Sequence, residues 1–162
     1  MRTRVIGLGN PILTDDAVGI LAAREITRRL ATRTAPGEIE VVESEVAGFA
    51  LMELMAGWDR VFFVDCLQFN GIDPGTVMRL QPEDLRISLR LRSVHEIDLP
   101  TALGLGRHLG LEMPREVVIY GIQAQDAASF GTDLTSAALG GMHEAVDLLL
   151  SEIAGPPEDV KK

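Results

Sequence analysis

Short apolar runs of strand length alternate along this chain with segments in which apolar residues recur at helical spacing. This alternation is typical of βαβ units, in which helices cover both faces of a mainly parallel sheet. The run at residues 61–64 is apolar throughout, which suits a strand buried on both faces. We therefore expect an α/β fold: a three-layer sandwich with a mainly parallel, twisted sheet of about five strands and helices on both faces.

Local patterns predict where the elements lie. Strands are predicted at residues 3–8, 39–42, 61–64, 76–80 and 117–120, with the fourth at an edge of the sheet. Helices are predicted at residues 16–30, 49–56, 99–109 and 135–153. Asp15 directly precedes the first helix, at a position where a short acidic side chain commonly accepts hydrogen bonds from free backbone N–H groups. Asp15 is therefore predicted to be the N-cap of that helix.

The length of the chain suits one domain. Its 162 residues are enough to bury a single substantial core, and no linker or internal repeat divides them. We expect residues 1–154 to form one α/β domain. Residues 155–162 contain Pro156, Pro157 and several charges, so they are predicted to be a flexible tail.

Charge and cysteine content bear on partners and compartment. The net charge of -9 opposes binding to nucleic acid, whose backbone is recognised largely through positive charge. The single cysteine, Cys66, suits a reducing compartment. The first apolar run, residues 5–8, is too short for the core of a signal peptide or for a membrane span. A cytoplasmic protein without a membrane span and without a nucleic-acid partner is expected.

Three candidate functional residues follow predicted strands or lie in connections between elements. Asp16 opens the first helix, Asp65 directly follows the third strand, and His95 precedes the helix at residues 99–109. Ligands of open α/β sheets bind at the carboxyl ends of the strands, where these residues could converge. Two carboxylates and one imidazole suit a divalent ion such as zinc, nickel or manganese. Such an ion could polarise a peptide carbonyl or lower the pKa of an attacking water.

Simpler interpretations exist for each of these residues taken alone. Asp16 would complement the dipole of the helix, Asp65 would form a turn, and His95 would be an ordinary loop residue.

Gly7 and Gly9 permit a tight turn or begin a nucleotide-binding loop; the second interpretation is weakened by the missing third glycine and by the two aspartates that follow. A nucleophilic pair of Cys66 and His95 is disfavoured because Asp65 raises the pKa of the adjacent thiol.

The residues around these candidates resemble a known family. Residues 5–19, VIGLGNPILTDDAVG, are similar to the opening of the hydrogenase maturation endopeptidases, and the resemblance continues through residues 64–66, 93–99, 118–123 and 134–135. It extends from residue 1 to about residue 153. By position, the resemblance implies that Asp16, Asp65 and His95 are the metal ligands and the catalytic residues. Two departures are Ala17, where the family often has glycine, and Asp16, where some members have glutamate.

The resemblance also implies a reaction. It predicts a metal-dependent endopeptidase that removes the C-terminal extension from the nickel-loaded large-subunit precursor of a nickel-iron hydrogenase. It further implies that the precursor supplies the nickel and that other divalent ions could occupy the same ligands. Because the predicted ligand set contains no thiolate, it would hold the ion weakly and release it to the product.

Two alternatives belong to other functional classes. Residues 5–11 are also similar to the start of bacterial peptidyl-tRNA hydrolases, but the residues that follow, Leu13-Thr14-Asp15-Asp16, differ from that family, and the acidic charge opposes tRNA. A metal-carrying chaperone without catalytic activity could use the same three ligands. It would bind the large subunit and shorten nothing.

Overall fold

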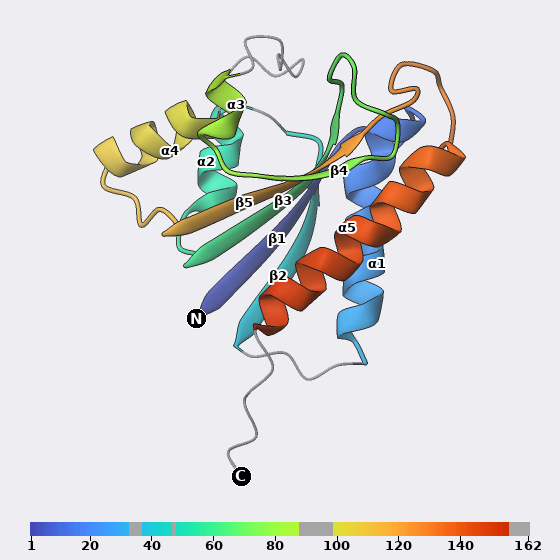
Figure 1. Ribbon diagram of the computed structural model, residues 1–162. Coiled ribbons are helices and arrows are strands. Elements are labelled where there is room, and N and C mark those ends of the chain that lie inside the picture. The colour runs from blue at the N-terminus through green and yellow to red at the C-terminus, as the bar shows by residue number, and fades with distance from the viewer. Residues whose placement is uncertain (33–36, 47, 88–98, 156–162) are drawn as a thin grey trace.

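A twisted sheet of five strands forms the centre of the computed structural model, which describes residues 1–32, 37–46, 48–87 and 99–155 (Figure 1). Within these residues the sheet has the order β2-β1-β3-β5-β4. Four strands are parallel and β4 runs antiparallel to β5 at one edge. The strands are β1 (Arg2–Leu8), β2 (Glu38–Ser44), β3 (Arg60–Leu67), β4 (Val77–Leu80) and β5 (Glu116–Gln123). The predicted α/β class, the mainly parallel sheet and the edge strand are confirmed.

Helices pack on both faces of this sheet, as Figure 1 shows. One face is covered by α1 (Val18–Leu30) and α5 (Ser136–Ala154), and the other by α2 (Phe49–Met55) and α4 (Leu99–His108). A three-residue 3-10 helix, η1 (Asp15–Ala17), precedes α1, so the predicted first helix is really two elements. A short helix that the sequence patterns did not predict, α3 (Asp84–Ile87), follows β4.

The strands contribute side chains to two apolar cores, because successive side chains of a strand point to opposite faces of the sheet. Phe62 and Val64 of β3 pack with Val18 and Ile26 of α1 and with the inner face of α5. Val61 and Phe63 alternate with them and pack against α2 and α4 instead. This arrangement explains why residues 61–64 are apolar without a break.

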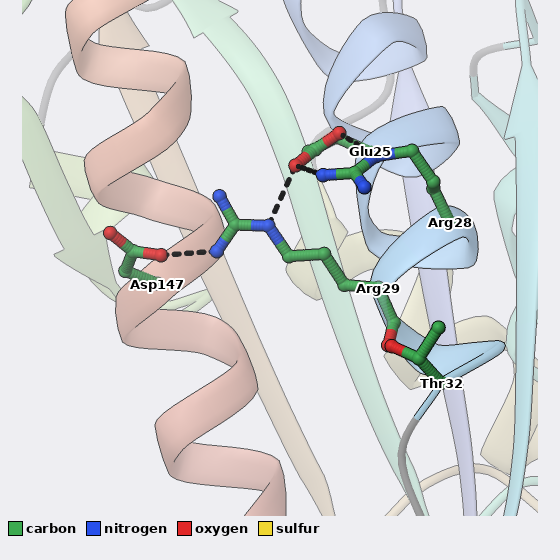
Figure 2. Close-up of polar contacts among 5 residues, drawn as sticks. All are labelled: Glu25, Arg28, Arg29, Thr32 and Asp147. Carbon is green, nitrogen blue, oxygen red and sulfur yellow. Dashed lines mark hydrogen bonds and ion pairs between the residues drawn. The ribbon is translucent and has the colours of Figure 1, made fainter.

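Ion pairs join the two helices on the first face. Arg29 of α1 donates a 2.7 Å hydrogen bond to Glu25, also of α1, and forms an ion pair with Asp147 of α5 (Figure 2). Glu25 also accepts hydrogen bonds from Arg28, and these hydrogen bonds to the two guanidinium groups lower its pKa to about 2. Arg29 thereby links the outer surfaces of α1 and α5.

Residues 156–162, which make up most of the predicted flexible tail, lie outside the described residues. Among the helices of the described ranges, none has both the length and the hydropathy to cross a bilayer.

Candidate active site

The order of the strands reverses at β1, which lies between β2 and β3. From β1 the chain passes through α1 to β2 on one side, and then through α2 on the opposite face to β3 on the other side. At such a switch point, α/β proteins bind their ligands at the carboxyl ends of the strands. Asp15 and Asp16 follow β1, and Asp65 lies near the end of β3. Two of the three predicted site residues therefore lie at this position.

Close backbone packing fixes the turn after β1. A Cβ atom on Gly19 of α1 would lie 2.1 Å from the Leu8 carbonyl oxygen and 2.3 Å from that of Val64. Gly9 has a φ of +150°, and a Cβ atom there would lie 2.0 Å from the carbonyl oxygen of Asp16. The backbone of the turn and the start of α1 thus touch β1 and β3 directly, which leaves Asp16 little freedom to move.

Asp15 is fully buried, and its carboxylate binds a distant loop. It accepts hydrogen bonds from the backbone N–H groups of Gln125 (2.9 Å), Asp126 (3.0 Å) and Thr135 (2.8 Å), and from the Thr135 hydroxyl (2.9 Å). The prediction that Asp15 caps its own helix is wrong, because its oxygens accept from donors 110 to 120 residues further along the chain. Thr135 is the N-cap of α5, and its hydroxyl accepts from the N–H of Ala138. Asp15 therefore joins the loop after β1 to the loop after β5.

Asp16 has a different environment although it is the next residue. It is half-buried and accepts one hydrogen bond, from the backbone N–H of Asn10 at 3.1 Å. It lies in η1, which contacts β3. No described residue donates a hydrogen bond to its second carboxylate oxygen. That oxygen is therefore available to a ligand.

Asp65 lies inside β3 and not after it, because β3 continues to Leu67. Beyond the end of its pairing with β1, β3 remains paired with β5, and Asp65 lies opposite Gly121. Asp65 is half-buried, and the desolvation of its carboxyl group raises the pKa of Asp65 to about 7. A 2.8 Å hydrogen bond from the N–H of Cys66 opposes the rise, and the negative charge of Asp16 adds to it.

The two acids form a site that suits a cation. Neither Asp16 nor Asp65 forms a salt bridge with a basic group of the described residues, and the two carboxyl groups repel each other. Hard carboxylate oxygens bind divalent ions, and such an ion would offset this repulsion. No group of three metal-binding side chains occurs within residues 1–32, 37–46, 48–87 and 99–155. His95, the third predicted ligand, lies outside these ranges, so its position and the complete ligand set stay predictions.

Cys66 does not have the environment of a nucleophile. Burial raises the pKa of the Cys66 thiol, and the negative charges of Asp65, Asp16 and Asp15 raise it further. A catalytic cysteine needs the opposite environment, which stabilises the thiolate. The pair of Cys66 and His95 is accordingly disfavoured by the surroundings of the thiol as well as by the sequence.

This chain matches the model of a known protein family. The family model described as hydrogenase maturation protease matches residues 23–152. The hydrogenase 2 maturation protease of Escherichia coli is 29% identical over 123 residues, which cover 75% of this chain and 73% of that protein. The hydrogenase expression/formation protein HupD of Bradyrhizobium diazoefficiens is 23% identical over 94% of this chain and 78% of its own length.

Solved structures agree with the sequence matches. The hydrogenase maturating endopeptidase HybD from Escherichia coli superposes with a TM-score of 0.76 at 26% identity, covering 93% of this chain and 90% of that one. The HybD maturation protease from Thermococcus kodakarensis gives a TM-score of 0.71 at 23% identity, covering 93% of this chain and 100% of that one, which shows a shared fold.

The two adjacent aspartates should respond differently to the same isosteric change. In Asp15→Asn, an amide nitrogen replaces one of two buried acceptor oxygens, so we expect unfolding to become easier by on the order of 2–4 kcal/mol. Asp16→Asn keeps an oxygen for the Asn10 N–H and should cost less than about 1 kcal/mol. Urea-induced unfolding of both variants measures these values. Equal losses would contradict a structural role that is confined to Asp15.

The raised pKa of Asp65 predicts a pH-dependent stability in protein freed of metal ions. Because the folded-state pKa is about 7 and the unfolded one about 4, folding favours the protonated acid. Its contribution is full below pH ~4 and is lost as the pH rises through about 7. Asp65→Asn should therefore gain stability relative to the native protein between pH 5 and pH 8. Denaturant unfolding at both pH values tests this, and parallel pH profiles would contradict it.

Proposed function

The chain belongs to the hydrogenase maturation protease family, and from this premise we propose that it removes the C-terminal extension of the nickel-loaded large-subunit precursor of a nickel-iron hydrogenase. An endopeptidase role in hydrogenase maturation follows from the family. The removal of a C-terminal extension, the nickel-loaded precursor as substrate, and the use of its nickel in the reaction are proposals.

The observation that supports this proposal is the pair of uncompensated acids at the switch point. Asp16 and Asp65 offer oxygen donors, and the described residues place no basic side chain in an ion pair with either. Desolvation raises the pKa of Asp65, and the negative charge of Asp16 adds to the rise. We propose that these carboxylates, with His95, complete the coordination of the nickel that the precursor carries. An acid pair of this kind is stabilised when the substrate brings the positive charge.

The chemistry of this ligand set suits a temporary contact. Oxygen and imidazole donors compete poorly with thiolates for a late first-row ion, so the nickel would remain with a product that holds it by softer ligands. While bound, the ion can polarise a nearby peptide carbonyl or activate a water molecule. The enzyme would thus cut only a precursor in which the metal is already in place. A cytoplasmic location fits this role and the single cysteine of the chain.

The direct test is to incubate the protein with nickel-loaded and with nickel-free precursor and to follow the mass of the precursor. Loss of a C-terminal peptide from the loaded form alone is the expected result. Binding without any change of mass would indicate a metal-carrying chaperone instead. Cleavage of both forms would overturn the dependence on nickel, and neither binding nor cleavage would overturn the proposal as a whole.

Variants of the proposed ligands identify the residues that act. Asp16→Asn, Asp65→Asn and His95→Ala should each lower the rate of processing by at least about 100-fold, since losing a few kcal/mol of stabilisation by the ion has an effect of that size. Cys66→Ala is the matched control, because it changes the neighbour of Asp65 without removing a proposed ligand; it should keep nearly full activity. Mass spectrometry of the precursor over time measures the rates. An inactive Cys66→Ala protein that is correctly folded would favour the thiol mechanism.

A further inference from the structure

Beside the candidate site, two loops form a small antiparallel ribbon. Leu13 and Phe130 make an isolated β-bridge, Gly131 donates a 3.0 Å hydrogen bond to the carbonyl of Ile12, and Thr14 donates one of 3.0 Å to that of Ser129. We call residues 12–14 and 129–131 the rim ribbon. Its first strand leads directly into Asp15 and Asp16. In Figure 1 the orange loop before α5 lies close to the blue segment that follows β1.

The rim ribbon is held firmly, although it lies at the surface. The carboxylate of Asp126 accepts hydrogen bonds from the N–H groups of Ala128 (3.1 Å) and Ser129 (2.9 Å), which fixes the turn before Phe130. The Thr14 hydroxyl donates a further 2.8 Å bond to the Ser129 carbonyl. The buried carboxylate of Asp15 joins the two loops through hydrogen bonds from the N–H groups of Gln125, Asp126 and Thr135.

This braced ribbon directs large apolar side chains into water. Phe130 is 82% exposed and Ile12 is 55% exposed. Burial of such a side chain is favourable, so holding a phenylalanine outward does nothing for the fold of the isolated chain. An aromatic side chain on a rigid support is, in contrast, typical of the anchors of protein interfaces, and rigidity lowers the entropy lost on binding.

Other exposed apolar side chains lie in neighbouring loops. Val46 follows β2, Phe49 is the first residue of α2, and Ile72 follows β3. The segments that hold them leave the sheet at the same carboxyl edge as the rim ribbon. The turn after β2 also contacts the turn after β1, because Gly9 donates a 3.2 Å hydrogen bond to the carbonyl of Ser44. Exposed apolar groups distributed over four loops suit a broad protein surface better than a short peptide in one groove.

We propose that the rim ribbon is the docking element for the folded large-subunit precursor, with Phe130 as the main anchor and Ile12 beside it. This inference rests on the proposed function, which makes a folded protein the substrate of the acid pair. A partner that places a metal ion near Asp16 must also meet the ribbon that leads into Asp16. The ribbon then contributes affinity for the partner, and the two acids contribute the contact with the ion.

The test compares Phe130→Ala and Ile12→Ala with Leu109→Ala. Leu109 is a matched control because it is 59% exposed and precedes β5, at the opposite edge of the sheet. The KM for nickel-loaded precursor is measured for each variant. The Kd of each variant for the precursor is measured with Asp65→Asn added, because that change slows cleavage. We expect Phe130→Ala to raise both about tenfold, which is typical for loss of an interface anchor, with kcat, thermal unfolding and binding of free Ni²⁺ unchanged. Ile12→Ala should have a smaller effect and Leu109→Ala none.

The outcomes separate this proposal from the proposed function. Equal KM and Kd for Phe130→Ala and the native protein, while the native protein still processes the precursor, would overturn the docking element alone. If Phe130→Ala raises the Kd but the native protein does not process the precursor, the docking element is supported and the proposed cleavage is overturned. A native protein that neither binds nor processes the precursor would overturn both.

Discussion

The buried carboxylate of Asp15 is the interaction on which the candidate site depends. It accepts three backbone hydrogen bonds and one from a hydroxyl, all from residues 125–135, and it has no contact with water. Hydrogen bonds to a charged acceptor are among the stronger ones in proteins, and a buried acceptor without partners would be costly. The turn after β1, the loop after β5 and the start of α5 are therefore fixed relative to one another by a single side chain.

That anchor explains why two neighbouring aspartates have separate roles. Asp15 is directed inward and saturated with donors, whereas Asp16 accepts one hydrogen bond and lies near Asp65. Gly9 packs closely on the backbone of Asp16, and Gly19 packs on β1 and β3. These contacts hold the carboxylate of Asp16 at the switch point. The fold thus uses one acid for stability, which allows it to leave the next one incompletely paired.

The sequence predicted the parts of the fold that depend on local patterns. The apolar alternation located all five strands of the described sheet, and the rule for parallel sheets placed Asp16 and Asp65 at its carboxyl edge. The prediction for Asp15 was wrong, because a local rule makes this residue the N-cap of the helix that follows it, whereas the donors it binds are distant in the sequence. The third strand was also predicted to end too early. Asp65 interrupts the apolar run locally, but pairing with β5 extends β3 to Leu67. The exposure of Phe130 depends on a pairing between distant loops, which no local pattern reveals.

The same site is unfavourable for the isolated chain in two ways that a single partner would relieve. Asp65 is partly desolvated beside the charge of Asp16, and Phe130 is held in water on the rim ribbon. A protein that brings a cation would offset the repulsion of the acids, and its surface would bury the aromatic ring. Neither gain alone identifies a partner, since a free ion satisfies the acids and any apolar surface covers the ring. Their adjacency favours a partner in which a metal ion and a protein surface arrive together, which is what a metal-loaded precursor would provide.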